Sequence, residues 1–538
     1  MSPQEISEFL CPDLGSLPAP ELMADLPEAV RLIRQAIARR EKILLVGDYD
    51  VDGLTGTALL YWGLREMKAN VECYIPHRLD EGYGLKPELI RKAAASRAKL
   101  LITIDCGTTS FSELTLAKEL GLTAIVVDHH ELHPAGRPPV SAFLNPLRPD
   151  CHYPTKGLAS VGVAFTLWRG LAGAQGDDRI WRHMDLAALG TVADVAPLKG
   201  ENRVLVKRGL HQLQGTSKVG LRALLSKTGL DGEQLSTEDI SFKLAPRLNA
   251  MGRTGSADAT LRLLITEDPQ EAAALVQQME QQNKTRGALE REALKRALAK
   301  VERQVNFSRD RVIVLEDDRW HLGVVGIVAS RLAARFHRPA VVIAMNGSVC
   351  RGSARSVRDF HLVEAFEAVK EHLLEFGGHA GAAGLTIARD RVDSFRQALN
   401  EVAHQRMDRE MLSPVLDCDA IVPLTELSDE VLRDLQVLAP FGAGNPLPIF
   451  VSDEARIPTD TTRLSFDPRG MRFYVEDRTG RCFEALQPKQ EIAEGWELDP
   501  FRGGDVRMVY SPMIRRDRTG GTIELTLRDL KRPNAVSI

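Results

Sequence analysis

The chain has 538 residues, too many for one hydrophobic core, so three or four domains are expected. Its composition, 44% hydrophobic and 26% charged, is that of an ordinary folded protein and argues against extensive disorder. The formal net charge of -4 excludes a uniformly basic surface, so any contact with nucleic acid must be confined to a local patch.

The seven cysteines are widely scattered and include no Cys-x-x-Cys pair, so reduced thiols fit better than a disulfide framework or a zinc site. The sequence has no run of 18 or more apolar residues, and its first residues do not form a basic region followed by an apolar one. We therefore expect a soluble, cytoplasmic protein with no membrane segment.

The first part of the chain alternates helix and strand patterns. After an amphipathic helix at 27–40, three apolar runs read as strands, and helical patterns lie between them. The strands are predicted at 43–46, 100–104 and 124–127, and the helices at 54–67, 87–95 and 112–120. This alternation predicts a doubly wound α/β fold on a parallel sheet.

Each of these predicted strands runs directly into polar residues. The first is followed by Asp48, Asp50 and Asp52, the second by Asp105, and the third by Asp128-His129-His130. If the first segment is extended, its alternating aspartates point to one side; the other interpretation is a loop with a helix-capping aspartate. Because ligands of parallel sheets bind beyond the carboxyl ends of the strands, we expect the three clusters to face one cleft.

A mainly helical region follows. A fourth acidic residue, Asp194, comes after a helical pattern at 181–189, and the helical region extends to about residue 264. Asp268-Pro269 has the pattern of an N-cap followed by proline in the first turn, opening a polar helix that runs to about residue 305. So long a helix with few apolar positions indicates a spacer between two bodies.

The last two parts of the chain read as a second α/β domain and a β-barrel. The α/β pattern comprises strands at 312–315, 340–344 and 385–387, helices at 324–336 and 362–376, a loop of small residues at 351–356 and a glycine loop at 377–384. From about residue 414, short alternating runs such as 471–475, 506–510 and 522–527 predict a small barrel.

The sequence thus divides into five predicted parts. They are a helical segment at 1–40, an α/β domain at 41–205, a helical region with the spacer helix at 206–305, a second α/β domain at 306–405 and a β-barrel at 414–538.

Six residues of the first α/β domain form a ligand set of carboxylates with one imidazole: Asp48, Asp50, Asp52, Asp105, His129 and Asp194. Oxygen-rich sites with some nitrogen suit Mg²⁺ or Mn²⁺, and the imidazole favours Mn²⁺. Five carboxylates are too many for one catalytic ion with open positions, whereas two ions sharing a bridging carboxylate would use them all. Two ions roughly 3.5–4 Å apart are a standard arrangement for hydrolysing phosphate esters, which is the chemistry we predict.

At this point the residues resemble a known family. Asp128-His129-His130 is the name-giving motif of the DHH phosphoesterases, and residues 46–53 resemble that family's first motif. Gly378-His379 is similar to the associated DHHA1 domain, and the barrel resembles an OB-fold. From about residue 40 to its end, the chain is similar to the single-strand-specific DNA exonucleases of this family. The resemblance implies a metal-dependent 5′→3′ exonuclease that degrades single-stranded DNA to mononucleotides in repair and recombination.

The resemblance also implies a role for each motif residue. Asp52, Asp105, His129 and Asp194 would hold one Mn²⁺, and Asp48, Asp50 and Asp105 a second, with Mg²⁺ as a possible substitute. His130 would donate to the scissile phosphate, while Asp128 would orient the neighbouring imidazole or backbone.

Six further residues are candidates for contacts with substrate phosphates. Arg78 and Arg253 could each bind a phosphate through two N–H groups, or form structural ion pairs. Ser353, Arg355, Gly378 and His379 could form a nest of donors for a phosphate, or an ordinary helix C-cap with a left-handed glycine. The resemblance implies that they hold the 5′ end and the adjacent phosphates.

The barrel would track a single strand with basic and aromatic side chains, as OB-folds do. Phe473, Tyr474, Tyr510 and residues 515–518 are candidates, although aromatic residues in strands are more often part of the core. The resemblance further implies a single-strand-binding protein and a helicase as partners, and we expect a monomer.

Two other functions remain open. A DHH phosphodiesterase of short oligonucleotides or cyclic dinucleotides would need only the two α/β domains, so the barrel argues against it. A catalytically silent nucleic-acid-binding scaffold would be expected to have lost some metal carboxylates, whereas all of them are present in this sequence.

Overall fold

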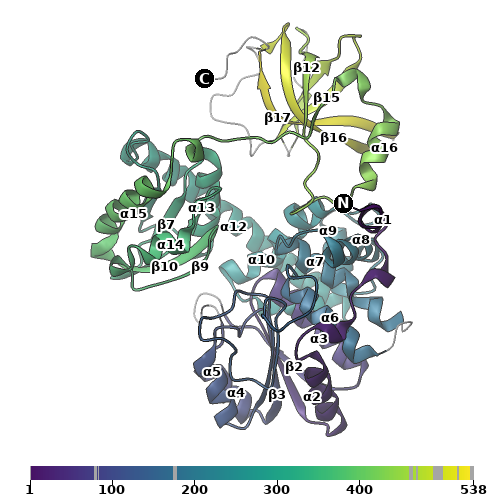
Figure 1. Cartoon of the computed structure of the whole chain (residues 1–538), viewed down its shortest axis with the longest axis vertical. Helices are drawn as coiled ribbons and strands as arrows, with labels where there is room; N and C mark the ends of the chain where they lie inside the picture. Colours follow the sequence, from purple (N-terminus) through teal and green to yellow (C-terminus); the bar gives the residue numbers. More distant parts are fainter. Residues whose placement is uncertain are drawn as a thin grey trace. The chain divides into compact units, whose positions relative to one another are not determined.

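Figure 1 shows the computed structural model of the chain, which describes residues 2–77, 82, 84–173, 178–459, 464–467, 470–488, 501–517 and 520–532. The chain forms two compact units, Met1–Ser413 with Gly442–Gly444, and Pro414–Phe441 with Asn445–Ile538. Across the described ranges, no helix combines the length and the apolar character needed to cross a membrane.

The first unit begins with a parallel sheet in the strand order β2-β1-β3-β4-β5. Its strands are β1 (Lys42–Gly47), β2 (Asn70–Tyr74), β3 (Ala98–Ile104), β4 (Thr123–Val127) and β5 (Ala142–Leu144). The predicted doubly wound α/β fold is confirmed. The strand order changes direction between β1 and β3, since β2 is added on one side of β1 and β3, β4 and β5 on the other. The sequence pattern missed β2, a half-exposed edge strand, and β5, which has three residues.

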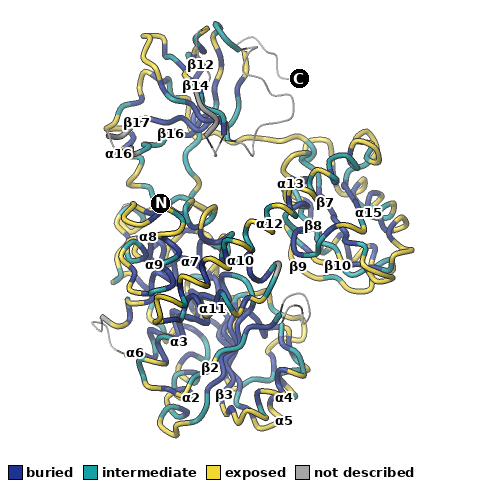
Figure 2. Tube along the Cα trace, turned by 180° about the vertical axis from the view of Figure 1, so that it is seen from behind, coloured by how far each residue is buried: buried dark blue, intermediate teal, exposed yellow. Residues whose placement is uncertain are grey.

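Helices cover both faces of this sheet. They are α2 (Leu26–Ala38), α3 (Val51–Glu66), α4 (Pro87–Ala95), α5 (Phe111–Glu119), α6 (Ser160–Ala172) and α7 (Met184–Ala193). Successive strand residues point to opposite faces, so Leu45 packs in the cluster with α2, α3, α6 and α7, and Leu44 in the cluster with α4 and α5. The strands β1, β3, β4 and β5 are mostly buried, and the strands at the centre of this sheet accordingly appear dark blue in Figure 2.

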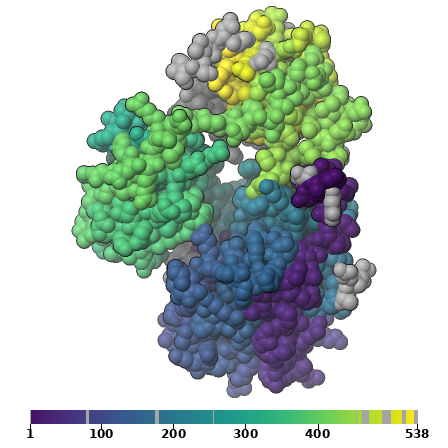
Figure 3. All heavy atoms as spheres, in the orientation of Figure 1, coloured from purple at the N-terminus to yellow at the C-terminus, as the bar shows by residue number. Residues whose placement is uncertain are grey.

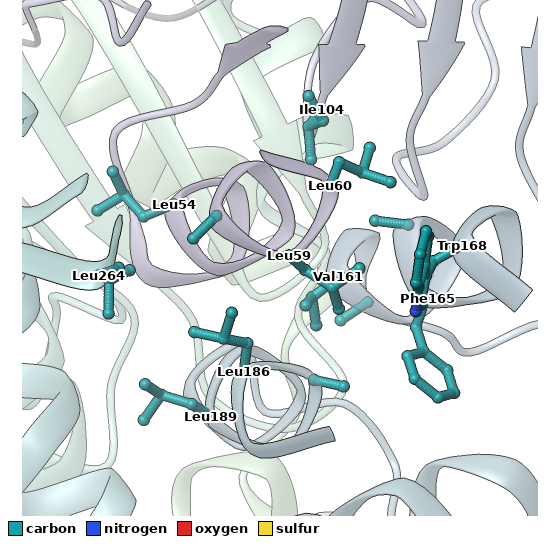
Figure 4. Packing of buried hydrophobic residues seen from close by; sticks show 14 of the residues in the cluster. Leu54, Leu59, Leu60, Ile104, Val161, Phe165, Trp168, Leu186, Leu189 and Leu264 are labelled. Carbon is teal, nitrogen blue, oxygen red and sulfur yellow. The ribbon is translucent and has the colours of Figure 1, made fainter. Parts of the chain in front are cut away.

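The helices α3, α6 and α7 are buried almost all round, as expected of helices inside a core. Figure 4 shows their side chains in one packed cluster; those labelled on the three helices are Leu54, Leu59, Leu60, Val161, Phe165, Trp168, Leu186 and Leu189. A glycine permits the close approach of α3 to α6, because a Cβ atom at Gly63 would lie 2.5 Å from the ring of Trp168.

The N-terminal segment, with α1 (Pro3–Leu10), is held on this body by basic side chains. Arg203 donates to the carbonyl oxygen of Phe9 at 2.7 Å and lies 3.9 Å from its ring centroid. Lys207 donates to Leu10, and Arg169 to Pro18. In Figure 3 the purple N-terminal residues accordingly lie against the blue α/β body.

The helical region comprises α8 (Gly200–Gln214), α9 (Val219–Lys227), a π-helical turn η4 (Asp239–Leu244), α10 (Ala245–Thr254), α11 (Asp258–Ile265) and α12 (Pro269–Gln304). The predicted long helix is confirmed as α12, and the Asp268 side chain caps it by accepting from the Gln270 amide. The first half of α12 buries Leu275 and Met279 in the first core, and its second half buries Ala297 and Val301 against β6 and α13.

A mixed sheet follows in the order β6-β7-β8-β10-β9, in which only β6 and β7 pair in parallel. Its elements are β6 (Ile313–Asp317), α13 (Leu322–Phe336), β7 (Ala340–Ala344), β8 (Val349–Arg355), α14 (Leu362–Glu367), β9 (Glu375–His379), β10 (Ala382–Ala388) and α15 (Val392–Arg406). The predicted second α/β domain is confirmed.

Three details of that prediction are wrong. The expected loop at 351–356 is largely strand β8, the expected helix at 362–376 ends at Glu367, and the expected glycine loop is the hairpin of β9 and β10. Glycine and small polar residues occupy these strands, so the apolar alternation that marks a strand is missing from the sequence.

The second unit contains the predicted β-barrel. Its strands are β11 (Ala420–Ile421), β12 (Phe450–Arg456), β13 (Leu464–Asp467), β14 (Gly470–Glu476), β15 (Cys482–Pro488), β16 (Asp505–Asp517) and β17 (Gly520–Lys531), with the helix α16 (Asp429–Val437) between β11 and β12. They pair in the order β11-β12-β16-β17-β15-β14-β13, and the extra pairing of β12 with β14 closes the barrel.

The close approach of α3 and α6 gives a prediction about stability. Gly63→Val forces Trp168 to move and should destabilise the protein by about 2 kcal/mol, as overpacking does. Urea denaturation of the full chain, followed by tryptophan fluorescence, measures the effect. The matched control is Gly287→Ala in α12, where an added Cβ meets only the end of the Arg291 side chain, and which should stabilise by up to about 1 kcal/mol. Equal effects of the two substitutions would contradict the prediction.

Candidate metal centre

Three aspartates are placed side by side by the sheet itself. The first residue after β1, β3 and β4 still donates its backbone N–H to the next strand: Asp48 to Ile104 at 3.1 Å, Asp105 to Val127 at 3.0 Å and Asp128 to Leu144 at 3.0 Å. All three side chains are buried. The polar clusters predicted at successive strand ends therefore meet at one edge of the sheet.

The first motif forms a helix start rather than an extended run. Asp50 is the N-cap of α3, and its Oδ1 accepts from the amides of Asp52 and Gly53. Asp52 lies in the first turn of the helix, so the expectation of three alternating side chains on an extended segment is wrong, while the expected helix cap is present. A Cβ atom at Gly53 would lie 2.7 Å from the backbone of Asp48, so this position requires glycine.

The six residues of the predicted ligand set converge, and His130 joins them. Three groups have ligand atoms within 4.8 Å of one another: Asp48, Asp50 and Asp105; Asp52, His129 and Asp194; and Asp105, His129 and His130. The Nε2 atom of His129 lies 3.4 Å from Asp105 and 3.8 Å from Asp52, and its Nδ1 lies 3.8 Å from Asp194. Asp105 and His129 each belong to two groups and so lie at the centre of the cluster.

Burial and mutual repulsion make this cluster electrostatically costly without a cation. Burial raises the pKa of Asp105 well above its usual range, and the charges of Asp50 and Asp52 raise it further. Burial likewise raises the pKa values of Asp52 and Asp194. Carboxylate oxygens with one imidazole are the donors that Mn²⁺ and Mg²⁺ accept, so the residues present fit a divalent metal centre.

Asp128 and His130 form a separate ion pair beside the cluster. The buried Asp128 accepts from His130 Nδ1 at 2.8 Å, and from the amides of Thr108, His129 and His130. Although burial opposes it, the hydrogen bond from His130 holds the pKa of Asp128 well below its usual range. In turn, the pKa of His130 rises to about 9 against the effect of burial, because of Asp128. In the absence of bound metal, His130 is therefore protonated at neutral pH, and its side chain is 44% exposed.

Two residues that the sequence did not single out support the cluster. Ser160 opens α6; its Oγ donates to Asp105 at 2.9 Å, and the amides of Ser160 and Val161 donate to Asp52 at 2.7 and 2.8 Å. Asn145 follows β5 and donates to the carbonyl oxygen of His130. Asn145 gave the same signal as the aspartates, a polar residue after a strand, but β5 was too short to be recognised.

The candidate phosphate-binding residues occupy different elements. Arg253 lies in α10 and donates to the carbonyl oxygen of Gly323 at 3.3 Å. Ser353 and Arg355 lie on β8 and are joined by a hydrogen bond of 3.1 Å, so they do not lie in a loop as predicted. Arg78 lies outside the described residues.

Gly378 and His379 lie on β9, so the alternative interpretation as a helix C-cap is wrong. Gly378 has a φ of 144°, and a Cβ atom there would meet the carbonyl oxygen of Ala382 at 2.3 Å. The pKa of His379 is lowered, mainly by partial burial and next by the charge of Arg355. The charge of His130 acts in the same direction. His379 therefore lies within electrostatic reach of both Arg355 and His130.

In the barrel, the candidate aromatic residues differ in exposure. Phe473 and Tyr510 are fully buried in the core, whereas Tyr474 is 39% exposed. Arg515 pairs with Glu484 at 2.9 Å. Arg518 lies outside the described residues, as do the side chains of Arg516 and Asp517.

The fold and the site define a DHH-family protein. Residues 42–191 match the N-terminal domain of the DHH family, residues 309–405 match the DHHA1 domain, and residues 418–529 match the RecJ OB domain.

Relatives specify the family further. The single-stranded-DNA-specific exonuclease RecJ of Dickeya dadantii is 38% identical over 454 residues, 80% of this chain and 78% of the relative. That of Bacillus subtilis is 37% identical over 475 residues, 88% of this chain, but the match spans 59% of the length of that relative. The chain belongs to the RecJ family.

Solved structures agree with this assignment. The crystal structure of RecJ in complex with Mn²⁺ from Thermus thermophilus superposes with a TM-score of 0.82 at 33% identity, covering 98% of this chain and 74% of that one. The complex of the same protein with Mg²⁺ superposes with a TM-score of 0.76.

The raised carboxylate pKa values give a prediction about metal binding. Protons compete with a metal for Asp52, Asp105 and Asp194, so Mn²⁺ affinity should fall as the pH is lowered from about 8 to about 6, and binding should release protons. Isothermal titration calorimetry in two buffers of different ionisation enthalpy measures both quantities. As a control, Asp105→Asn should bind Mn²⁺ more weakly at every pH. An affinity independent of pH would contradict the assignment of these carboxylates.

Proposed function

We propose that this chain is a metal-dependent exonuclease that degrades single-stranded DNA from its 5′ end to mononucleotides. The observation that carries the proposal is the convergence of Asp48, Asp50, Asp52, Asp105, His129 and Asp194 beside a cationic His130. The names of the relatives and the match of the barrel to the RecJ OB domain support the choice of single-stranded DNA.

In this proposal the carboxylates hold two divalent ions, most suitably Mn²⁺. Asp52, His129 and Asp194 would hold one ion and Asp48 and Asp50 the other. Asp105 would be shared, because it is grouped with Asp48 and Asp50 and also lies 3.4 Å from His129. When bound, two such ions supply Lewis acidity toward phosphate oxygens and make a nucleophilic water available. Ser160 and the first amides of α6 keep Asp52 and Asp105 in position.

His130 and Asp128 are the proposed catalytic pair. Asp128 keeps the His130 ring protonated and engages its Nδ1 atom, so the Nε2–H is the second donor of the ring, which we propose faces the phosphate. A protonated imidazole there stabilises the negative charge that develops on the phosphate during hydrolysis.

The remaining candidates would bind the strand. We propose that Arg78, Arg253, Ser353, Arg355, Gly378 and His379 hold the 5′ end and the adjacent phosphates; the electrostatic reach between His379 and both Arg355 and His130 supports this. An exposed Tyr474 on the barrel suits a stacked base.

We also propose the cellular setting and the domain division that the sequence suggested. The protein would act in DNA repair and recombination in the cytoplasm, as a monomer, with a single-strand-binding protein and a helicase as partners. The domain boundaries would lie at 1–40, 41–205, 206–305, 306–405 and 414–538.

One assay tests the activity. Wild-type protein is incubated with 5′-labelled single-stranded DNA, the matched duplex and a dinucleotide, each with Mn²⁺, Mg²⁺ or chelator. We expect mononucleotides from the single strand with either metal and no product with chelator, because the carboxylates cannot act without cations. Cleavage of the dinucleotide alone would favour a phosphodiesterase of short oligonucleotides. Binding without cleavage in every metal would favour an inactive scaffold.

The shared position of Asp105 gives a second prediction. Asp105→Ala should abolish hydrolysis more completely than Asp48→Ala, because Asp105 lies in two of the three ligand groups and Asp48 in one. Initial rates on single-stranded DNA at saturating Mn²⁺ make the comparison, and circular dichroism checks that both variants are folded. Equal residual rates would count against a bridging role.

A further inference from the structure

An exposed aromatic residue lies on the π-helical turn that precedes α10. Phe242 is 64% exposed, and within the part of the chain that the structure describes no aromatic ring or cation packs on it. The other strongly exposed phenylalanine of this unit, Phe307, is stacked on Phe336 at 5.2 Å. A single exposed phenylalanine is common on protein surfaces, so the significance of Phe242 depends on the residues beside it.

Phe242 begins a strip of accessible residues along α10. Pro246, Asn249 and Arg253 follow it at spacings of four, three and four residues, and all are incompletely buried. The residues between them are mostly buried: Leu244, Ala245, Leu248, Ala250, Met251 and Gly252. Spacings of three and four place Pro246, Asn249 and Arg253 on one face of α10, and Phe242 precedes this face on the π-helical turn, so we treat the four accessible residues as one strip. Among the described residues, the Asn249 side chain has no hydrogen-bond partner.

The end of α10 that carries Arg253 lies beside the metal centre. A Cβ atom at Gly252 would lie 3.1 Å from the carbonyl oxygen of Tyr49, the residue between Asp48 and Asp50. The ten residues of α10 span about 15 Å, which matches roughly four nucleotides at the 3.4 Å spacing of stacked bases. A strand lying on this strip would thus have one end at the metals and a base at Phe242.

The chemistry of the strip suits a single strand. An aromatic ring stacks on any base, an amide bonds to polar groups on bases or phosphates, and a guanidinium binds phosphate. The neighbouring cations contribute little net charge, because Lys243 pairs with Asp239 at 2.8 Å and Arg247 pairs with Glu280. Stacking on Phe242 is therefore the main source of affinity at the far end of the strip.

We propose that the face of α10 formed by Pro246, Asn249 and Arg253, together with Phe242 on the preceding π-helical turn, carries the incoming single strand. Phe242 would be a stacking platform for the base about four nucleotides from the cut. The inference rests on the proposed function for the identity of the ligand. It assigns to Phe242 a role in positioning the strand and none in the hydrolysis itself.

The first test measures strand affinity of the full chain in chelator, where nothing is cut. Phe242→Ala should bind a single strand of about twelve nucleotides about tenfold more weakly, and a strand of about three nucleotides with unchanged affinity. Phe242→Trp should restore the affinity. The matched control is Leu120→Ala, an apolar residue that is 44% exposed at the end of α5 and should change neither value.

A second test locates the base. An abasic position introduced at the third to sixth nucleotide should weaken the affinity of wild-type protein about as much as Phe242→Ala does. In the Phe242→Ala variant the same abasic position should cause little further loss of affinity, because the two changes remove the same contact. Independent, additive losses overturn the inference. So does a Phe242→Ala variant with unchanged affinity for the long strand, or one whose only effect is the loss of a dimer in light scattering.

The two proposals fail separately. If wild-type protein cuts no strand with any metal, the proposed function fails, while the coupling between the abasic position and Phe242 still decides the platform. If wild-type protein cuts single strands but the coupling is absent, the platform alone fails.

Discussion

The carboxylates beyond β1, β3 and β4 are held close together although their charges repel, and the rest of the first unit can be understood from this constraint. Backbone hydrogen bonds of Asp48, Asp105 and Asp128 to the neighbouring strands fix the three side chains at one edge of the sheet. Because these groups are also buried, the pKa of Asp105 is raised and ionisation is disfavoured. Carboxylates held together in this way repel one another when ionised, and a divalent metal ion would neutralise their charge.

The surrounding helices reduce this cost with their N-termini. The first amides of α6 donate to both oxygens of Asp52, and those of α3 donate to Asp50, so two helix dipoles point their positive ends at the cluster. Asp128 differs from these carboxylates because it accepts hydrogen bonds from backbone amides and from His130. It therefore stays ionised and favours the protonated form of His130. The site thus contains two kinds of carboxylate: the proposed metal ligands, and Asp128, which orients an imidazole. Their different hydrogen-bond partners account for the difference.

The strands and helices that were predicted correctly are those with the clearest pattern of apolar residues in the sequence. The buried strands β1, β3 and β4 are continuous apolar runs and were located within two residues, and the capping pattern of Asp268-Pro269 marked the start of α12. In β8, β9 and the first half of β10, glycine and small polar residues replace the apolar alternation, so these segments were taken for loops or helix, whereas the apolar end of β10 at 385–387 was predicted as a strand. Their strand geometry comes from pairing with one another, a long-range interaction that no local pattern encodes.

The sequence by itself pointed to five of the six proposed ligands, because a strand end followed by acidic or histidine residues is a local signal that repeats three times; the sixth, Asp194, follows the helix α7. Only the tertiary structure decided how these residues combine. Asp105 and His129 are each shared between two groups, Ser160 supports Asp52 and Asp105, and Gly252 of α10 lies against Tyr49. The physical reason is distance along the chain. These contacts join residues tens to hundreds of positions apart, and their geometry exists only after the sheet and its helices have packed.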